Sequence, residues 1–286
     1  MPQPDQIPEV LQTVDIILYV IGTLVCGSLA YFWLRIRGGR IDWGPDRPNR
    51  LDWTSIAVVV VAFWACAWIG SATTGMFDIQ SQTPEDAGAI QLAFTNAAAL
   101  LGGAIACAVI GLKKFQAGWR GFGLVTGFAR RDLIITGATL LALWPLVMGS
   151  LFWSEILVRA ALGDSAIHDH SAIALLENEA LPTWIHWLVI LTAAVLAPIA
   201  EEMFFRGILQ TRFFNALHSR RGAVIATALC FAIMHGDQPA AVLPIAVLGI
   251  ILGVLYEMTG SLLAPILVHT LFNTKSLLWH YWITAA

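Results

Sequence analysis

Long runs of apolar residues recur along the whole chain and constrain its fold more than any other feature. The runs lie at about residues 14–34, 54–76, 88–112, 133–157, 183–205, 222–235, 240–257 and 262–283. A helix of about 20 apolar residues crosses a bilayer, where only helices and closed barrels satisfy their backbone hydrogen bonds. These runs predict an all-α, multi-pass transmembrane bundle of about eight spans in the cell membrane.

The composition supports this class and excludes several others. The chain is 58% hydrophobic and only 12% charged, whereas soluble domains carry about 25% charged residues. It has no basic run suited to nucleic acid, so we expect the lipid bilayer and no nucleic acid among its partners. The four cysteines lie inside apolar runs without paired spacing, and we expect neither disulfides nor metal ligands among them.

Lysine and arginine concentrate in alternate loops, at 35–53, 113–132 and 206–221. The positive-inside rule places these three loops in the cytoplasm and both chain termini on the other side. The segment 37–53 is rich in Gly, Pro, Asp and Arg, and we expect little order in it.

Two adjacent glutamates, Glu201 and Glu202, follow a stretch without any charged residue. A carboxylate at mid-membrane depth costs roughly 2.5–3.5 kcal/mol on insertion scales. On a helix, Glu202 and Arg206 share one face and are placed for an ion pair, whereas Glu201 points about 100° away. We therefore expect Arg206 to neutralise Glu202 and Glu201 to be left for chemistry.

Further polar residues interrupt the last apolar runs. His235 closes its run one turn after Phe231, and His269 shares a helix face with Asn273 four residues later. Helical hairpins that turn near Ser219 and Gly260 would bring these side chains to depths similar to that of Glu201. We expect one polar cavity inside the membrane that opens toward the cytoplasm.

These side chains fit two hydrolytic mechanisms. Carboxylates in low-dielectric pockets are good general bases near neutral pH, and Glu201 could activate a water while His235 orients it. His269 and Asn273 could then stabilise the oxyanion of a tetrahedral intermediate, with no cofactor. Alternatively, Glu201, His235 and His269 form the His₂Glu ligand set of some catalytic zinc sites.

The three blocks resemble the CPBP family of intramembrane proteases, which includes the type II CAAX prenyl endopeptidases and the Abi proteins. The family motif EExxxR matches Glu201, Glu202 and Arg206, FxxxH matches Phe231 and His235, and HxxxN matches His269 and Asn273. The resemblance covers roughly residues 183–279. It implies a glutamate-activated water assisted by the first histidine, with the HxxxN pair as oxyanion hole.

On this basis residues 1–182 form four N-terminal spans with their loops, and residues 183–286 form a CPBP-like protease core of four spans. We expect an intramembrane endopeptidase that acts near the cytoplasmic membrane face on a peptide or membrane protein. Lipidated substrates of the CAAX-processing type are included. Glu202, Arg206 and Phe231 would support the site. The alternatives are the zinc protease and an Abi-like membrane protein that binds without catalysis.

Overall fold

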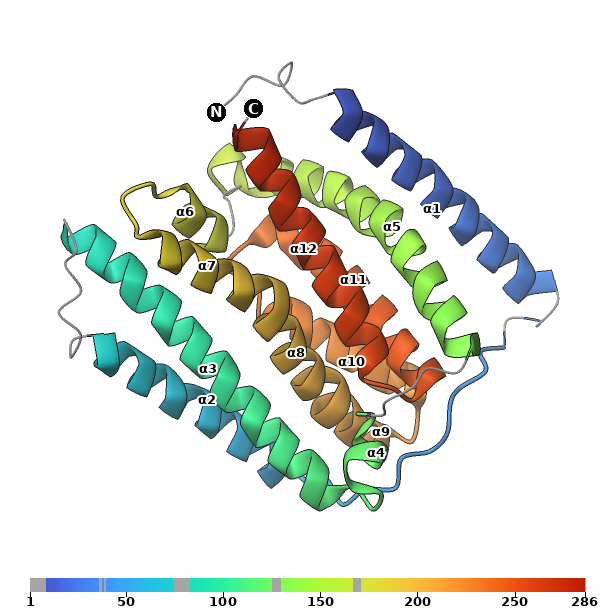
Figure 1. The fold of residues 1–286 in the computed structure, drawn as a ribbon. Helices are drawn as coiled ribbons and strands as arrows, with labels where there is room; N and C mark the ends of the chain where they lie inside the picture. The colour runs from blue at the N-terminus through green and yellow to red at the C-terminus, as the bar shows by residue number, and fades with distance from the viewer. Residues whose placement is uncertain are drawn as a thin grey trace.

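The structure, a computed structural model, describes residues 9–35, 38, 40–74, 83–124, 130–166 and 171–285. Within these ranges the chain forms helices and no β-strand (Figure 1). The first half supplies α1 (Glu9–Arg35), α2 (Trp53–Thr74), α3 (Pro84–Lys114), α4 (Gly118–Phe122), α5 (Arg130–Leu162), the short 3-10 turn η2 (Asp164–Ala166) and α6 (Ser171–Glu177).

The second half is organised around one unbroken helix from Thr183 to Leu217. Its consecutive parts are α7 (Thr183–Leu191), the π-helical η3 (Thr192–Leu196), α8 (Ala197–Glu202), the π-helical η4 (Met203–Gln210) and α9 (Thr211–Leu217). Three further helices follow, α10 (Arg220–Ile233), α11 (Pro239–Thr259) and α12 (Leu263–Ala285).

The turns between these helices lie where the sequence predicts them. His218 adopts a left-handed conformation with φ of 52° at the end of α9, and Ser219 caps α10 by accepting a hydrogen bond from the backbone N–H of Gly222. Gly260, with φ of 67°, ends α11. Both predicted hairpins are therefore present.

Five helices in the described part of the chain are long and apolar enough to cross a membrane, by length and composition. They are Trp53–Thr74, Pro84–Lys114, Arg130–Leu162, Thr183–Leu217 and Pro239–Thr259. The predicted sixth run, 222–235, corresponds to α10, whose 14 residues give a helix roughly 21 Å long, shorter than a bilayer core. The predicted class, a multi-pass helical membrane protein, is confirmed.

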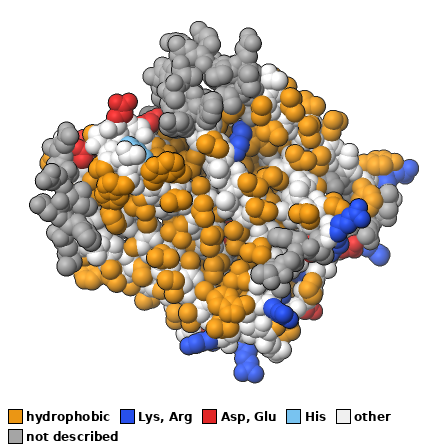
Figure 2. All heavy atoms as spheres, in the orientation of Figure 1, with side chains coloured by type: hydrophobic (Ala, Val, Ile, Leu, Met, Phe, Trp, Pro, Cys, Tyr) orange, Lys and Arg blue, Asp and Glu red, His pale blue; other side chains and the backbone are white. Residues whose placement is uncertain are grey.

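The surface has the character of a protein embedded in lipid. Trp64, Trp68 and Ile233 are each more than 60% exposed, which a water-facing surface would not favour. Figure 2 shows hydrophobic side chains over most of the visible face and charged side chains mainly near its margins. Lysine and arginine predominate at the margin formed by the loops that follow α1, α3 and α9.

Helix ends on the two sides of the bundle are fixed by local polar contacts. Thr83 caps α3 by accepting a hydrogen bond from the backbone N–H of Asp86. Asp52, just before α2, accepts hydrogen bonds from both the backbone and the hydroxyl of Ser55 and contacts Lys114. The Ser55 hydroxyl in particular holds the pKa of Asp52 well below its usual range.

The loop between α1 and α2 is ordered from about residue 43 onward, which contradicts the expectation of little order in 37–53. The backbone N–H of Gly44 donates to the carbonyl of Glu257, and the Arg47 guanidinium lies 2.6 Å from the Glu257 carboxylate. Arg220, after α9, also approaches this carboxylate at 3.6 Å. The Glu257 side chain is a helix-end charge, as expected, but it is buried and binds two loops together.

Candidate active site

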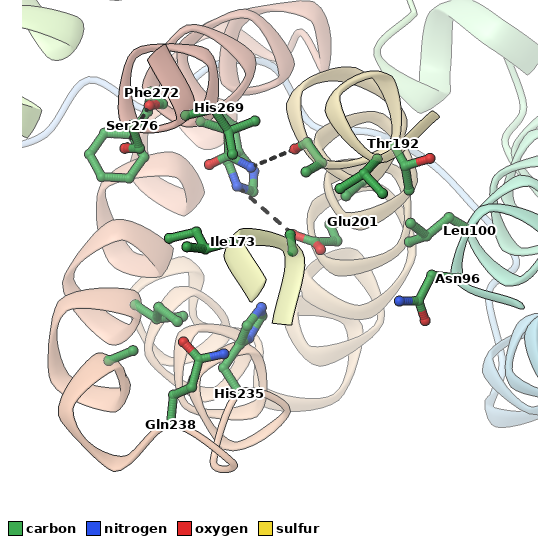
Figure 3. A pocket seen from close by; sticks show the side chains of 18 of the residues that line it. Asn96, Leu100, Ile173, Thr192, Glu201, His235, Gln238, His269, Phe272 and Ser276 are labelled. Carbon is green, nitrogen blue, oxygen red and sulfur yellow. Dashed lines mark hydrogen bonds and ion pairs between the residues drawn. The ribbon is translucent and has the colours of Figure 1, made fainter. Parts of the chain in front are cut away.

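The two hairpins bring the predicted site residues to one cavity. Glu201, His235, His269 and Asn273 all line a cavity of about 440 Å³. Figure 3 shows the ring of His269 directed at Glu201, with His235 projecting from the turn after α10. Glu201 keeps about a fifth of its side chain exposed, so this carboxylate is open to a small molecule inside the cavity.

Glu202 pairs with Arg206 as predicted. Their side chains are completely buried, and Arg206 Nη1 lies 2.9 Å from Glu202 Oε1. Arg206 Nη2 also donates to the carbonyl of Gly249 on α11 at 3.3 Å. A buried ion pair is tolerated only when further hydrogen bonds compensate for lost hydration, and the Gly249 carbonyl accepts one such bond.

His269 bridges the two glutamates, which sequence reasoning did not predict. Its Nδ1 lies 2.9 Å from Glu202 Oε1, and its Nε2 lies 3.8 Å from Glu201 Oε2. A carboxylate paired with arginine accepts hydrogen bonds, so the geometry assigns a proton to Nδ1. Glu202 therefore orients the imidazole, and the opposite nitrogen faces the carboxylate that lines the cavity.

His235 is held by the carbonyl end of α10. Its Nδ1 lies 2.8 Å from the carbonyl oxygen of Phe231, and a carbonyl can only accept, so Nδ1 carries a proton. In the neutral ring, Nε2 is then an acceptor. Phe231 packs edge-on against both His235 and His269 at centroid distances of 4.9 and 6.0 Å. This buried ring supports the site, as predicted.

Asn273 has a structural partner. Its Nδ2 donates to the carbonyl of Ala193 at 3.0 Å. In η3 the backbone N–H of Ala197 donates to Thr192, five residues earlier. The residue five after Ala193 is Pro198, which has no N–H. The Ala193 carbonyl thus lacks a backbone donor, and one Asn273 N–H replaces it, leaving the second amide hydrogen for another acceptor.

The cavity extends to one side of these residues. On the long helix Glu201 is the last residue that lines it, and on α12 His269 is the first. The lining also includes Ile173 of α6, beyond these two residues. The Glu201 carboxylate and the His269 imidazole therefore form the floor of a cavity that reaches toward α6.

The sequence predicts an opening on the side of the basic loops, and packed side chains occupy that side in this structure. Below the floor, Arg206 and Gln210 are completely buried, and Gln210 donates to the Gly253 carbonyl and to Glu257. Packed polar side chains thus close the molecule between the cavity and the basic loops.

Several lining residues were not predicted from the sequence. They are polar side chains in apolar surroundings, namely Asn96 of α3, Thr192 of η3, Gln238 after α10 and Ser276 of α12. A single asparagine inside the apolar run 88–112 is a signal that could have identified Asn96.

The zinc hypothesis can be compared with the geometry. No three His, Cys, Asp or Glu side chains among the described residues are grouped closely enough to hold a metal ion. The two histidines nevertheless have the orientation typical of metal ligands. In each, Nδ1–H donates a hydrogen bond to a carbonyl or carboxylate, and the lone pair of Nε2 is left to bind a metal.

Comparison with known proteins supplies independent information. A family model described as type II CAAX prenyl endopeptidase Rce1-like matches residues 182–274. This stretch contains all three motifs, and the match confirms the resemblance stated from the sequence. Comparisons with curated proteins and with solved structures find no match.

Proposed function

We propose that this chain, whose residues 182–274 match the family model described as type II CAAX prenyl endopeptidase Rce1-like, is an intramembrane endopeptidase in which Glu201 activates the attacking water. The observation that carries the proposal is the arrangement of Glu201 and His269 at the floor of one cavity, 3.8 Å apart. The substrate is a peptide or membrane protein, with a prenylated C-terminal tail as the first candidate.

In the first step Glu201 takes a proton from water, and the water oxygen forms a bond to the carbonyl carbon of the substrate. The unprotonated Nε2 of His235 accepts the second hydrogen of this water and so fixes its direction. This role follows from the hydrogen bond that occupies His235 Nδ1.

In the second step the carbonyl oxygen becomes an oxyanion, which the free amide hydrogen of Asn273 stabilises. His269 Nε2 can donate a second hydrogen bond to this oxyanion only if that nitrogen carries a proton, and Glu201 is close enough to supply the proton. The C–N bond then breaks, and the proton that Glu201 took from the water passes, directly or through His269 Nε2, to the nitrogen of the leaving amine. Glu202 acts by holding His269.

The test uses purified protein and a short quenched fluorescent peptide that ends in an S-prenylated cysteine and three further residues. An unprenylated copy of this peptide is measured in parallel. We expect Glu201→Gln to abolish cleavage with the protein still folded in detergent. Cleavage at the wild-type rate by Glu201→Gln would contradict the proposal, and rescue of a deletion phenotype by this variant would favour the non-catalytic, Abi-like alternative.

A zinc-dependent protease is the second candidate, and the orientation of the two histidines favours it. Glu201, His235 and His269 are not grouped closely enough in this structure to hold an ion, so they would have to move together before a metal could supply a Lewis acid and an activated water there. Elemental analysis of pure protein separates the two candidates. A stoichiometric metal that disappears in His235→Ala, together with loss of cleavage in chelator and recovery with zinc, would support the metal enzyme.

A further inference from the structure

Two carboxamide side chains line the cavity without any partner in the described part of the chain. Asn96 lies on α3 and is exposed to the cavity, and Gln238 lies half-buried in the turn after α10. The carboxamides of Gln210 and Asn273, by contrast, each donate to a backbone carbonyl. Asn96 and Gln238 thus differ from Gln210 and Asn273, whose carboxamides bind other helices of the fold.

A carboxamide in apolar surroundings costs free energy unless its hydrogen bonds are made. Its oxygen accepts and its NH₂ group donates, so it can pair at once with the N–H and the C=O of a peptide main chain. Two such groups facing one cavity are suited to a polypeptide backbone and require no particular side chain of the occupant.

The two carboxamides lie on different walls near the reacting groups. Asn96 is 18 residues before Lys114 and Glu201 is 16 before Leu217, or roughly 27 and 24 Å along their helices from the basic end. Gln238 follows His235 by three residues. Figure 3 shows Gln238 beside His235 and Asn96 on the other side of Glu201.

We propose that Asn96 and Gln238 bind the main chain of the substrate on the two sides of the reacting bond, so that the enzyme accepts only an extended segment. This inference rests on the proposed endopeptidase function and names the conformation of its substrate. A helical segment has its N–H and C=O groups paired internally and offers them to neither side chain. The substrate class is therefore an unwound stretch or a disordered tail.

The proposal also assigns a role to the N-terminal half of the chain. Asn96 lies outside the residues that match the family model, on a helix that forms one wall of the cavity. α3 thereby completes the binding site that the second half begins.

The test measures binding in the Glu201→Gln background, so that cleavage does not interfere. The probe is the same prenylated peptide labelled with fluorescein, together with copies in which one backbone amide outside the reacting bond is replaced by an ester. The ester removes the N–H and weakens the carbonyl as an acceptor. Fluorescence anisotropy in detergent gives the dissociation constant Kd for each peptide.

We expect Asn96→Leu and Gln238→Leu each to raise the Kd of the all-amide peptide by about 3- to 10-fold, the range of one hydrogen bond. Each variant should also lose its discrimination against one particular ester peptide, on opposite sides of the reacting bond. Thr95→Val is the matched control, because Thr95 neighbours Asn96 but bonds to its own helix, and it should leave every Kd unchanged.

Unchanged affinity in both leucine variants would overturn the inference, as would an equal rise for the all-amide and every ester peptide. Asn96→Ala and Gln238→Ala are measured alongside, in case leucine obstructs the cavity. The proposed function fails separately, when wild-type cleavage does not depend on Glu201. Peptide binding that depends on Asn96 and Gln238 would survive that failure.

Discussion

Glu202 and His269 are joined by a hydrogen bond of 2.9 Å between Oε1 and Nδ1, and the same oxygen lies 2.9 Å from Arg206. One buried carboxylate oxygen therefore both completes an ion pair and orients an imidazole at the cavity floor. The two roles can be separated by mutation, because the ion pair concerns stability and the imidazole concerns the proposed catalysis.

Removal of one charge should destabilise the protein more than removal of both. Arg206→Met leaves Glu202 buried without its cation and should cost about 3–5 kcal/mol. The double variant Glu202→Leu with Arg206→Met should recover most of this stability in thermal unfolding. Its kcat should stay about 10- to 100-fold low, because His269 loses its orienting partner. Full recovery of kcat in the double variant would contradict the orienting role.

His235→Ala should abolish cleavage without unfolding the protein, because the half-buried ring contacts the cavity and its main packing partner, Phe231, remains. His218→Asn serves as the control. His218 is exposed in a left-handed turn that asparagine also tolerates, and this variant should keep wild-type cleavage. Equal losses in the two variants would indicate a general effect of histidine replacement.

Asn273→Ala should destabilise the protein by about 1–3 kcal/mol, because the Ala193 carbonyl loses its donor. In a Pro198→Ala background the new backbone N–H can reach this carbonyl, and the same change at Asn273 should cost less. A double-mutant cycle of thermal unfolding measures the difference. Equal costs in the two backgrounds would show that proline does not create the need for Asn273.

Gly207→Ala should destabilise the long helix where it passes α4. A Cβ at this position would lie 2.5 Å from Phe122 Cε2, and such overpacking typically costs about 1–3 kcal/mol. Gly149→Ala in α5 is the control, since a Cβ there has no neighbour within 4 Å. The control should be neutral or slightly stabilising in thermal unfolding, whereas a neutral Gly207→Ala would mean that Phe122 moves freely.

The direction of the cavity predicts opposite accessibility for two engineered cysteines. In a variant without native cysteines, Ser276→Cys lines the cavity and Ala216→Cys is exposed near the basic loops. A membrane-impermeant maleimide should label them from opposite faces of sealed vesicles. Labelling of both from one face would mean that the cavity is reached past the basic loops.

The sequence predicts most helices well because apolar runs and turn residues are local signals. The run 54–76 corresponds to α2, and the turns at Ser219 and Gly260 lie where expected. The apolar run ends at 205, whereas the long helix continues to Leu217, as the predicted turn near Ser219 requires. The charge of Arg206 is neutralised by Glu202 within the same helix.

Other features of the site have no local signal. The order of the loop around Arg47 depends on Glu257, more than two hundred residues away in sequence. The closed floor depends on Gln210 meeting α11. The partner of Asn273 follows from a π-helical turn before Pro198, and periodicity alone does not distinguish this turn from an ordinary helix.

One continuous helix from Thr183 to Leu217 carries Glu201, the Glu202–Arg206 ion pair and Gln210, which contacts α11. A helix holds the spacing of these groups along one axis. If the proposed peptide substrate requires more room than the cavity offers, that room must come from the other elements that line it, which include α6 and the face of α3 that bears Asn96.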